Sequence, residues 1–272
     1  MNNFLLKSNR WLFWLALSVS ACSGTSQENK ETVLLEDVQS KTALQGIWVD
    51  DNSGNVQFRA EGDSLYYPEK ESYPLYFKIM NENLVICGTD TVSYKIARLD
   101  KDSFWFQSIT DELIKLHRSE YELDSLEFVG KELTPIALYD DVVEKDSVVM
   151  LNNHRYRGYV YINPSTIRVF KTSYNENGMK IEQAFYDNII HICIYEGKKS
   201  LYAKDFSKKD FEKIVDEDFL RYAVLSDMDL IGADQRGFWY EASLCIPDEA
   251  SCYQVYILIS EDGTYTLHKS YE

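Results

Sequence analysis

Short runs of alternating apolar and polar residues fill the chain from Leu44 to Leu116. Apolar and polar side chains alternate in residues 56–59 and again in residues 94–99. A period of two indicates strands that bury one face. Turns rich in Asp, Asn, Gly and Ser return every roughly 8 to 12 residues, which is typical of an antiparallel meander. We therefore expect residues 41–119 to form a small antiparallel β-barrel or sandwich.

The C-terminal part, residues 120–272, combines two periods. Runs of aromatic and β-branched residues between 156 and 206 predict strands. A Ser-x-x-Asp start at Ser207 then opens a helical segment near 207–225, where apolar residues recur at spacings of three and four. Two more strands follow, so we expect an α+β domain. The predicted fold class is mainly β with a minor helical part: a small barrel followed by this α+β domain.

The N-terminus has a third pattern. Residues 1–10 contain two basic residues and no acid, residues 11–19 are an apolar run, and small residues lead up to Cys22. These three zones are typical of a secretory signal peptide, here residues 1–21. The apolar run has about half of the roughly 20 residues that span a bilayer, which argues against a permanent transmembrane helix.

The four residues Val19-Ser20-Ala21-Cys22 resemble the lipobox of bacterial lipoproteins. The resemblance implies that the Cys22 thiol is acylated and that the mature chain begins at this residue. Two or more acyl chains give stable membrane anchoring. We expect a cell-envelope protein held by this lipid, with residues 22–40 as a flexible tether. Ser23 after the cysteine is typical of outer-membrane sorting; whether the periplasmic or the outer face carries the anchor stays open.

The amino-acid composition indicates a folded protein and limits the kinds of partner that it binds. The 272 residues are 45% hydrophobic, which excludes general disorder. Without the signal peptide, 26 basic and 44 acidic residues give a net charge of −18. Such a surface repels nucleic acid, so we expect no nucleic-acid partner. It favours basic or neutral partners, or serves solubility alone.

Four cysteines follow Cys22. Cys87 and Cys193 lie inside apolar strand-like runs and are expected to be small buried side chains. Cys245 and Cys252 flank a turn-like segment, at positions that face each other across a hairpin. In an oxidising envelope they would be able to form a disulfide, although spacing alone leaves their geometry open.

Two resemblances to families add to this picture. Gly46-Ile47-Trp48 resembles the G-x-W opening of lipocalin-like domains, and the meander after it is similar to the short lipocalin-like modules of Bacteroidales lipoproteins. This implies that Trp48 plugs one end of a barrel filled by its own side chains. Residues 208–230 and 237–263 are similar to DUF4738-type lipoproteins of Bacteroidetes, a family that brings no known activity.

Motifs for common chemistry are missing. The chain has no P-loop, no G-x-G-x-x-G and no G-x-S-x-G. Residues 227–232 begin like a calcium loop, but Phe238 stands where the bidentate glutamate belongs. The four histidines lack zinc spacing. We therefore expect no cofactor and no metal, while a pair of catalytic carboxylates stays open because only geometry would identify it.

The remaining candidates for ligand contact are tyrosines near the barrel turns and a basic pair in an acidic chain: Tyr66, Tyr67, Tyr73, Arg155 and Arg157. Tyrosine rings stack on sugars and peptides. The preferred hypothesis is a non-catalytic module that binds a small molecule, a glycan or a protein. The alternatives are an envelope hydrolase with a carboxylate or histidine site, and an acidic inhibitor or scaffold for a basic partner.

Overall fold

The computed structural model describes residues 35–69, 71–130 and 133–271. These residues are mainly in strands, with four short helical segments, which confirms the predicted fold class. No helix among them is long and apolar enough to cross a membrane. The predicted signal peptide and Cys22 lie outside the described residues.

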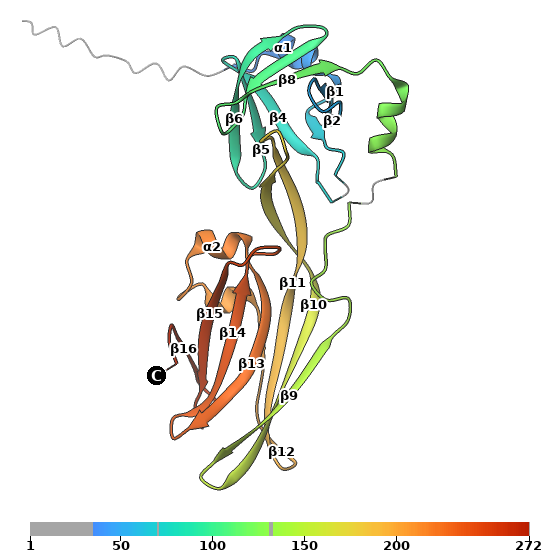
Figure 1. Cartoon of the computed structure of the whole chain (residues 1–272). Coiled ribbons are helices and arrows are strands. Elements are labelled where there is room, and N and C mark those ends of the chain that lie inside the picture. Colours follow the sequence, from blue (N-terminus) through green and yellow to red (C-terminus); the bar gives the residue numbers. More distant parts are fainter. Residues whose placement is uncertain (1–34, 70, 131–132, 272) are drawn as a thin grey trace, which may run out of the picture. The chain divides into compact units, whose positions relative to one another are not determined.

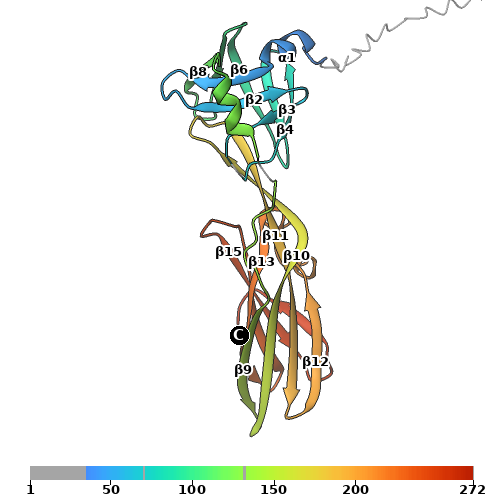
Figure 2. The ribbon, with the colours of Figure 1, turned by 90° about the vertical axis from the view of Figure 1, so that its right-hand side faces the viewer.

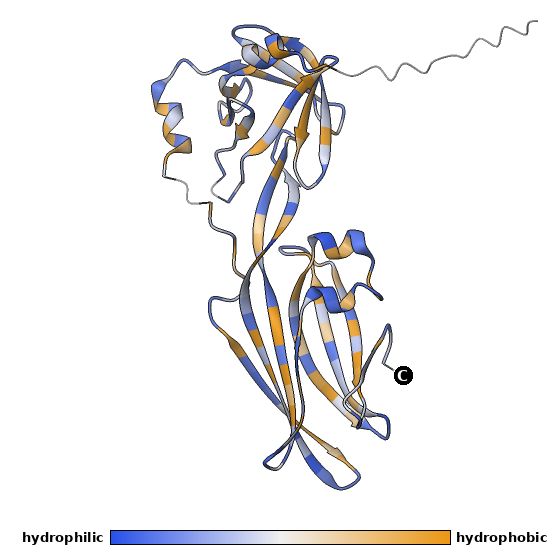
Figure 3. Ribbon diagram, turned by 180° about the vertical axis from the view of Figure 1, so that it is seen from behind, coloured by the Kyte–Doolittle hydropathy of each residue, from blue (hydrophilic) through white to orange (hydrophobic). Residues whose placement is uncertain are grey.

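Eight antiparallel strands follow one another in chain order and close into a barrel, because β1 pairs with both β2 and β8. All of them lie in the part of the chain predicted to form a meander, and Figure 3 shows apolar and polar residues mixed along the strands. The strands are β1 (Gly46–Asp50), β2 (Val56–Glu61), β3 (Ser64–Tyr66), β4 (Leu75–Met80), β5 (Asn83–Cys87), β6 (Thr91–Leu99), β7 (Ser103–Gln107) and β8 (Leu113–Arg118).

Aromatic side chains fill the barrel interior. The fully buried rings include Trp48, Phe58, Phe77, Tyr94, Phe104 and Phe106. Helix α1 (Val38–Leu44) lies at the tryptophan, whose indole N–H donates to the Leu44 carbonyl at 2.7 Å. The Arg118 guanidinium lies 4.6 Å from the centre of the same ring. Gly46 has a φ of +120°, which residues with a side chain rarely adopt, and a Cβ there would also collide with the Arg118 guanidinium, so the backbone here favours glycine.

Two four-stranded antiparallel sheets form the C-terminal part and share one apolar core. Figures 1 and 2 show the first sheet, in the order β12-β11-β10-β9, and the second sheet packed against it. The first contains β9 (Val143–Leu151), β10 (His154–Tyr174), β11 (Lys180–Glu196) and β12 (Lys199–Phe206). The second contains β13 (Val224–Asp234), β14 (Gly237–Cys245), β15 (Cys252–Ile259) and β16 (Tyr265–His268).

The helical part is shorter than the sequence predicted. The segment near 207–225 contains the 3-10 turn η2 (Lys208–Phe211) and helix α2 (Glu217–Tyr222), and another 3-10 turn, η1 (Glu122–Phe128), follows the barrel. Asp216 divides the segment because its side chain caps α2 by accepting from the Asp218 N–H. The prediction that Val224 and Leu225 extend the helical face was wrong: they begin β13 and pair with β14.

The hairpin of β10 and β11 contributes to both cores. Its strands have 21 and 17 residues. The first part of β10 pairs with β9 and the last part of β11 pairs with β12, so these parts lie in the four-stranded sheet. At its tip, Met179 and Ile181 are buried in the core of the barrel. The Tyr94 hydroxyl of β6 donates to the Gly178 carbonyl at 3.0 Å and accepts from the Lys180 N–H at 2.8 Å. The barrel is thus completed by residues that come much later in the chain.

A buried ion pair lies beside this junction. The Lys180 ammonium is 3.0 Å from the Glu182 carboxylate, and their side chains are 0% and 6% exposed. The ammonium also donates to the Asp90 carbonyl of the barrel. The Asp90 carboxylate accepts from the Tyr222 hydroxyl at 2.6 Å, so α2 is bonded to the same loop. Buried charges need such partners, because an isolated one costs several kcal/mol.

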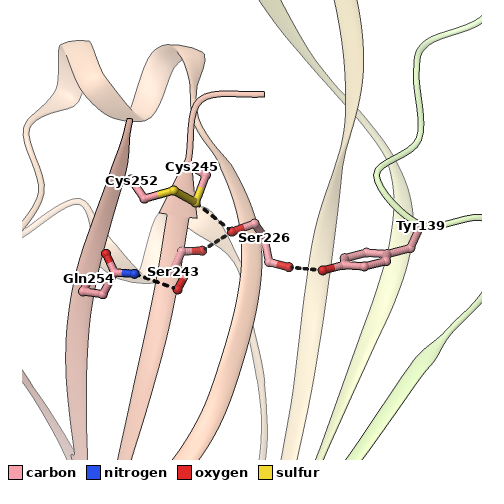
Figure 4. The surroundings of a disulfide bond; sticks show 6 residues. All are labelled: Tyr139, Ser226, Ser243, Cys245, Cys252 and Gln254. Carbon is pink, nitrogen blue, oxygen red and sulfur yellow. Dashed lines mark hydrogen bonds between the residues drawn. A yellow bond between two sulfur atoms is a disulfide. The ribbon is translucent and has the colours of Figure 1, made fainter. Parts of the chain in front are cut away.

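Cys245 and Cys252 form a disulfide across the β14–β15 hairpin (Figure 4). They are directly opposed in the strand register, with Cα atoms 4.1 Å apart. The Ser226 hydroxyl of β13 donates to the Ser243 carbonyl at 2.9 Å and lies 3.2 Å from the Cys245 sulfur. The Tyr139 hydroxyl donates to the Ser226 carbonyl at 3.1 Å, which connects the disulfide region to the segment before β9.

Candidate functional site

A cleft of about 450 Å³ opens between the two sheets at the end of the sandwich where β9 turns into β10. This volume is within the range of small-molecule sites in proteins, about 300 to 1,000 Å³. Both sheets contribute aromatic and charged side chains to its walls, among them Tyr156, Glu196, Lys199, Tyr202, Phe238 and Glu261. Aromatic and charged side chains of the two sheets thus meet on one concave surface.

Strand parity and register bring these residues together. Successive residues of a strand point to opposite faces, so Tyr156 faces the second sheet while its neighbours Arg155 and Arg157 face away. Tyr156 is directly opposite Glu196 on β11. From the second sheet, Phe238 packs edge-on against Tyr156 with ring centres 5.0 Å apart. The two rings form an aromatic wall that bridges the sheets.

Two tyrosine hydroxyls lie behind this wall. Tyr240 is fully buried, and Tyr202 lines the cleft. Neither hydroxyl has a hydrogen-bond partner among the described residues. Burial, with smaller contributions from Tyr265 and Asp210, raises the pKa of Tyr202 to about 12. Both hydroxyls are therefore neutral at ordinary pH, and buried hydroxyls of this kind are usually paired with a polar group.

Gly158 creates the space for Tyr240. A Cβ at this position would lie 2.8 Å from the Tyr240 hydroxyl and 2.5 Å from a methyl carbon of Leu230. Both distances are too short for real Cβ contacts, so a larger residue would push the second sheet away. The glycine thus sets how closely the sheets approach next to the cleft.

Two carboxylates lie close to the Tyr156 hydroxyl. Burial raises the pKa of Tyr156, and the negative charges of Glu196 and Glu261 raise it further. Glu196 is already bonded to His154, whose ring nitrogen lies 2.6 Å from the carboxylate oxygen. The side chains of His154 and Glu196 are 61% and 37% exposed. Water therefore screens this pair, unlike the desolvated pairs on which general acid–base catalysis depends.

The tyrosines predicted for ligand contact lie elsewhere, on the barrel. Tyr66 and Tyr67 line a much smaller pocket of about 150 Å³. Tyr67 is 2% exposed and belongs to the barrel core, so the prediction of an exposed stacking ring was wrong for it. The Tyr66 ring is covered by the Arg59 guanidinium at 4.9 Å. The Tyr73 hydroxyl donates to the Leu133 carbonyl at 2.7 Å, which holds the segment after η1.

The predicted arginines are on β10 but do not line the cleft. Arg155 is exposed, and Arg157 donates to the Asp146 carboxylate at 2.5 and 2.9 Å. Arg157 also lies 5.1 Å from the Tyr159 ring centre. In the His-Arg-Tyr-Arg segment, Tyr156 thus points to the face of the sheet that lines the cleft, and the two arginines point to the other face. Choosing the alternate residues of the same strand would have identified Tyr156.

A row of half-buried rings occupies the outer face of the first sheet. Tyr159 and Tyr161 are nearly parallel with centres 6.3 Å apart, and Tyr195 packs edge-on against Tyr159 at 6.0 Å. His191 continues the row and bonds Asp205 at 2.7 Å. The tyrosine-rich composition is therefore used for strand packing on both faces. This row lies on the sheet face opposite the cleft.

Within the ranges that the structure covers, no group of three or more His, Cys, Asp or Glu side chains gathers as a metal site. In the comparisons with known proteins, residues 123–267 match the family described as Domain of unknown function (DUF4738). The match covers more than half of the chain and includes both sheets of the sandwich, the cleft and the disulfide. No curated protein matches the sequence.

Proposed function

Because the chain belongs to the DUF4738 family, whose description names no activity, we propose from the cleft geometry that it is a lipid-anchored, non-catalytic binding protein. The observation that carries the binding function is the cleft itself: an aromatic wall with polar groups that converge on it from both sheets. Ligand sites combine apolar and aromatic walls with placed polar groups. The exposed lining of this cleft is more polar than apolar, so it suits a ligand that carries a polar group beside an apolar part.

The interior of the barrel is not a second candidate for the ligand site. Its interior is packed with the chain's own rings and with the tip of the β10–β11 hairpin, and Trp48 is fully buried at one end. A barrel filled in this way leaves its ligand-binding role to other surfaces. We propose that it is a lipocalin-like module of the kind found in Bacteroidales lipoproteins, which acts as a rigid support next to the tether. The Gly46-Ile47-Trp48 opening and the packing of Trp48 support that assignment.

The anchor is the other half of the proposal. The charge and hydropathy pattern of residues 1–22 supports acylation of Cys22 and retention at the outer membrane. The protein then presents its cleft to a small molecule, a glycan or a protein segment in the cell envelope. The high acidic charge favours a basic or neutral ligand.

Binding in the cleft is tested by a fragment screen on the purified protein. Methyl groups of Leu151, Leu201 and Ile259 line the cleft and are suitable NMR reporters. We expect some fragments to shift these methyl signals, and a Ser200→Trp variant, which places an indole at the rim, to weaken their binding at least fivefold. Ser53→Trp, on an exposed barrel turn, is the control and should leave binding unchanged. A screen in which no fragment shifts the cleft methyls would refute the binding function.

A further inference from the structure

The charged side chains of the cleft are mainly acidic, which favours cationic ligands over anionic ones. Its walls contain two carboxylates, Glu196 and Glu261, and one ammonium, Lys199. Glu196 already binds His154, whereas Glu261 forms none of the ion pairs among the residues that the structure describes. An unpaired carboxylate beside aromatic rings attracts a cation, because the ring faces carry negative charge as well.

The apolar walls of the cleft indicate which chemical group the ligand carries next to its charged nitrogen. Phe238, Leu201 and Ile259 offer an apolar surface next to Glu261. The Tyr202 side chain also lines the cleft, but its hydroxyl is buried behind the wall, so the polar contacts for a ligand come from the charged side chains at the rim. A ligand with an apolar stem and a charged nitrogen at its end satisfies the stem contacts, the ring faces and the carboxylates together.

We propose that the cleft binds an ammonium or guanidinium group carried on a short apolar stem. This proposal rests on the proposed binding function and specifies the class of ligand that the cleft binds. The stem packs against Phe238 and Leu201, while the cation lies between the Tyr156 ring and the carboxylates of Glu196 and Glu261. Two sources have this chemistry: a lysine or arginine side chain of a peptide, and a free alkyl amine. An anionic ligand is disfavoured because the two carboxylates of the cleft outnumber the one ammonium, that of Lys199, and because the whole chain has a net charge of −16.

The test compares four probes on the same methyl reporters. Acetyl-lysine amide and acetyl-arginine amide represent peptides, 1,5-diaminopentane represents free amines, and acetyl-norleucine amide is a neutral probe of similar shape. We expect the cationic probes to bind at least tenfold more tightly than the norleucine amide. The amides bind better than the diamine when the source is a peptide, and the diamine binds better when it is a free amine.

Two variants that each remove one negative charge distinguish binding to the cleft carboxylate from attraction by the acidic charge of the whole chain. Glu261→Gln should weaken binding of the cationic probes about fivefold to tenfold, because it removes a charge-assisted contact. It should leave the norleucine amide unchanged. Glu127→Gln, an exposed residue of η1, removes the same charge outside the cleft and should change neither.

The possible results are distinct. Equal binding of all four probes at the cleft methyls, unaffected by Glu261→Gln, would overturn the cation preference and leave the binding function intact. Equal weakening by Glu261→Gln and Glu127→Gln would also overturn it, since the whole-chain charge then accounts for the attraction. If no probe shifts the cleft methyls, the neutral one included, the proposed function fails together with this inference.

Discussion

At the scale of single residues, the approach of the two sheets depends on Gly158. Its missing side chain admits the Tyr240 hydroxyl and a Leu230 methyl at distances that no Cβ permits. Neither neighbour is a flexible chain end with free space, because both are buried in the sandwich core. Small-to-large changes in packed cores cost about 1 to 3 kcal/mol.

Gly158→Ala should therefore lower the free energy of unfolding by about 1 to 3 kcal/mol. Chemical denaturation followed by tryptophan fluorescence measures this change. Gly232→Ala is a matched control in β13, because its Cβ would meet only the Tyr271 hydroxyl at 3.2 Å. We expect the control to stay within about 0.5 kcal/mol of the native protein. Equal stability of both variants would contradict the packing argument.

Asp234 gives a residue-scale prediction for pH dependence. Hydrogen bonds from the Arg236 side chain, then from its backbone N–H and the Trp239 indole, lower the pKa of Asp234 from 3.8 to about 2. A lowered carboxylate pKa stabilises the fold above the unfolded value, and this contribution is lost as the pH falls from 3.8 towards 2. The melting temperature of Asp234→Asn should thus fall less steeply over this window than that of the native protein. Parallel melting curves against pH would show that the carboxylate has no such role.

At the scale of elements, the short runs and turns predicted an antiparallel meander, because half-buried strands of a meander need only local turns and a period of two. Whether it closes as a barrel or forms a sandwich stayed open in the sequence; the pairing of β1 with β8 closes it as a barrel. The helical segment was extended too far since Val224 and Leu225 continue an apolar spacing of three and four, while tertiary pairing with β14 places them in a strand. The cleft was missed for a different reason. Pairing within the first sheet places Glu196 opposite Tyr156, and only the packing of the second sheet adds Glu261 to them.

The β10–β11 hairpin allows a prediction for one element acting on another. Met179 is fully buried among barrel side chains although it lies in the turn between two strands of the first sheet. Met179→Ala should cost about 2 to 5 kcal/mol, because it leaves a cavity in the barrel core. Methyl NMR signals of Leu84 and Ile86, barrel residues in the same cluster, should shift as well. Met150→Ala, on the 60% exposed Met150 of β9, is the control and should cost little.

At the scale of the whole molecule, the proposed membrane anchor depends on the thiol of Cys22. Cys22→Ala should remove the acyl chains and move the protein from the detergent phase to the aqueous phase in a phase-partition experiment. Ser23→Ala keeps the thiol and should remain in the detergent phase. A Cys22→Ala protein that still incorporates labelled fatty acid would contradict the anchor.

The shared hairpin also has a consequence for the order of folding. The last barrel strand ends at Arg118, whereas the tip that fills the barrel comes at Met179. During synthesis, all eight barrel strands therefore emerge before the residues that complete their interior. Until the hairpin arrives, apolar rings at that mouth are uncovered and prone to self-association. A fragment that stops at residue 119 would lack the Met179 and Ile181 side chains of the barrel core, so we expect it to be less stable than the barrel of the whole chain.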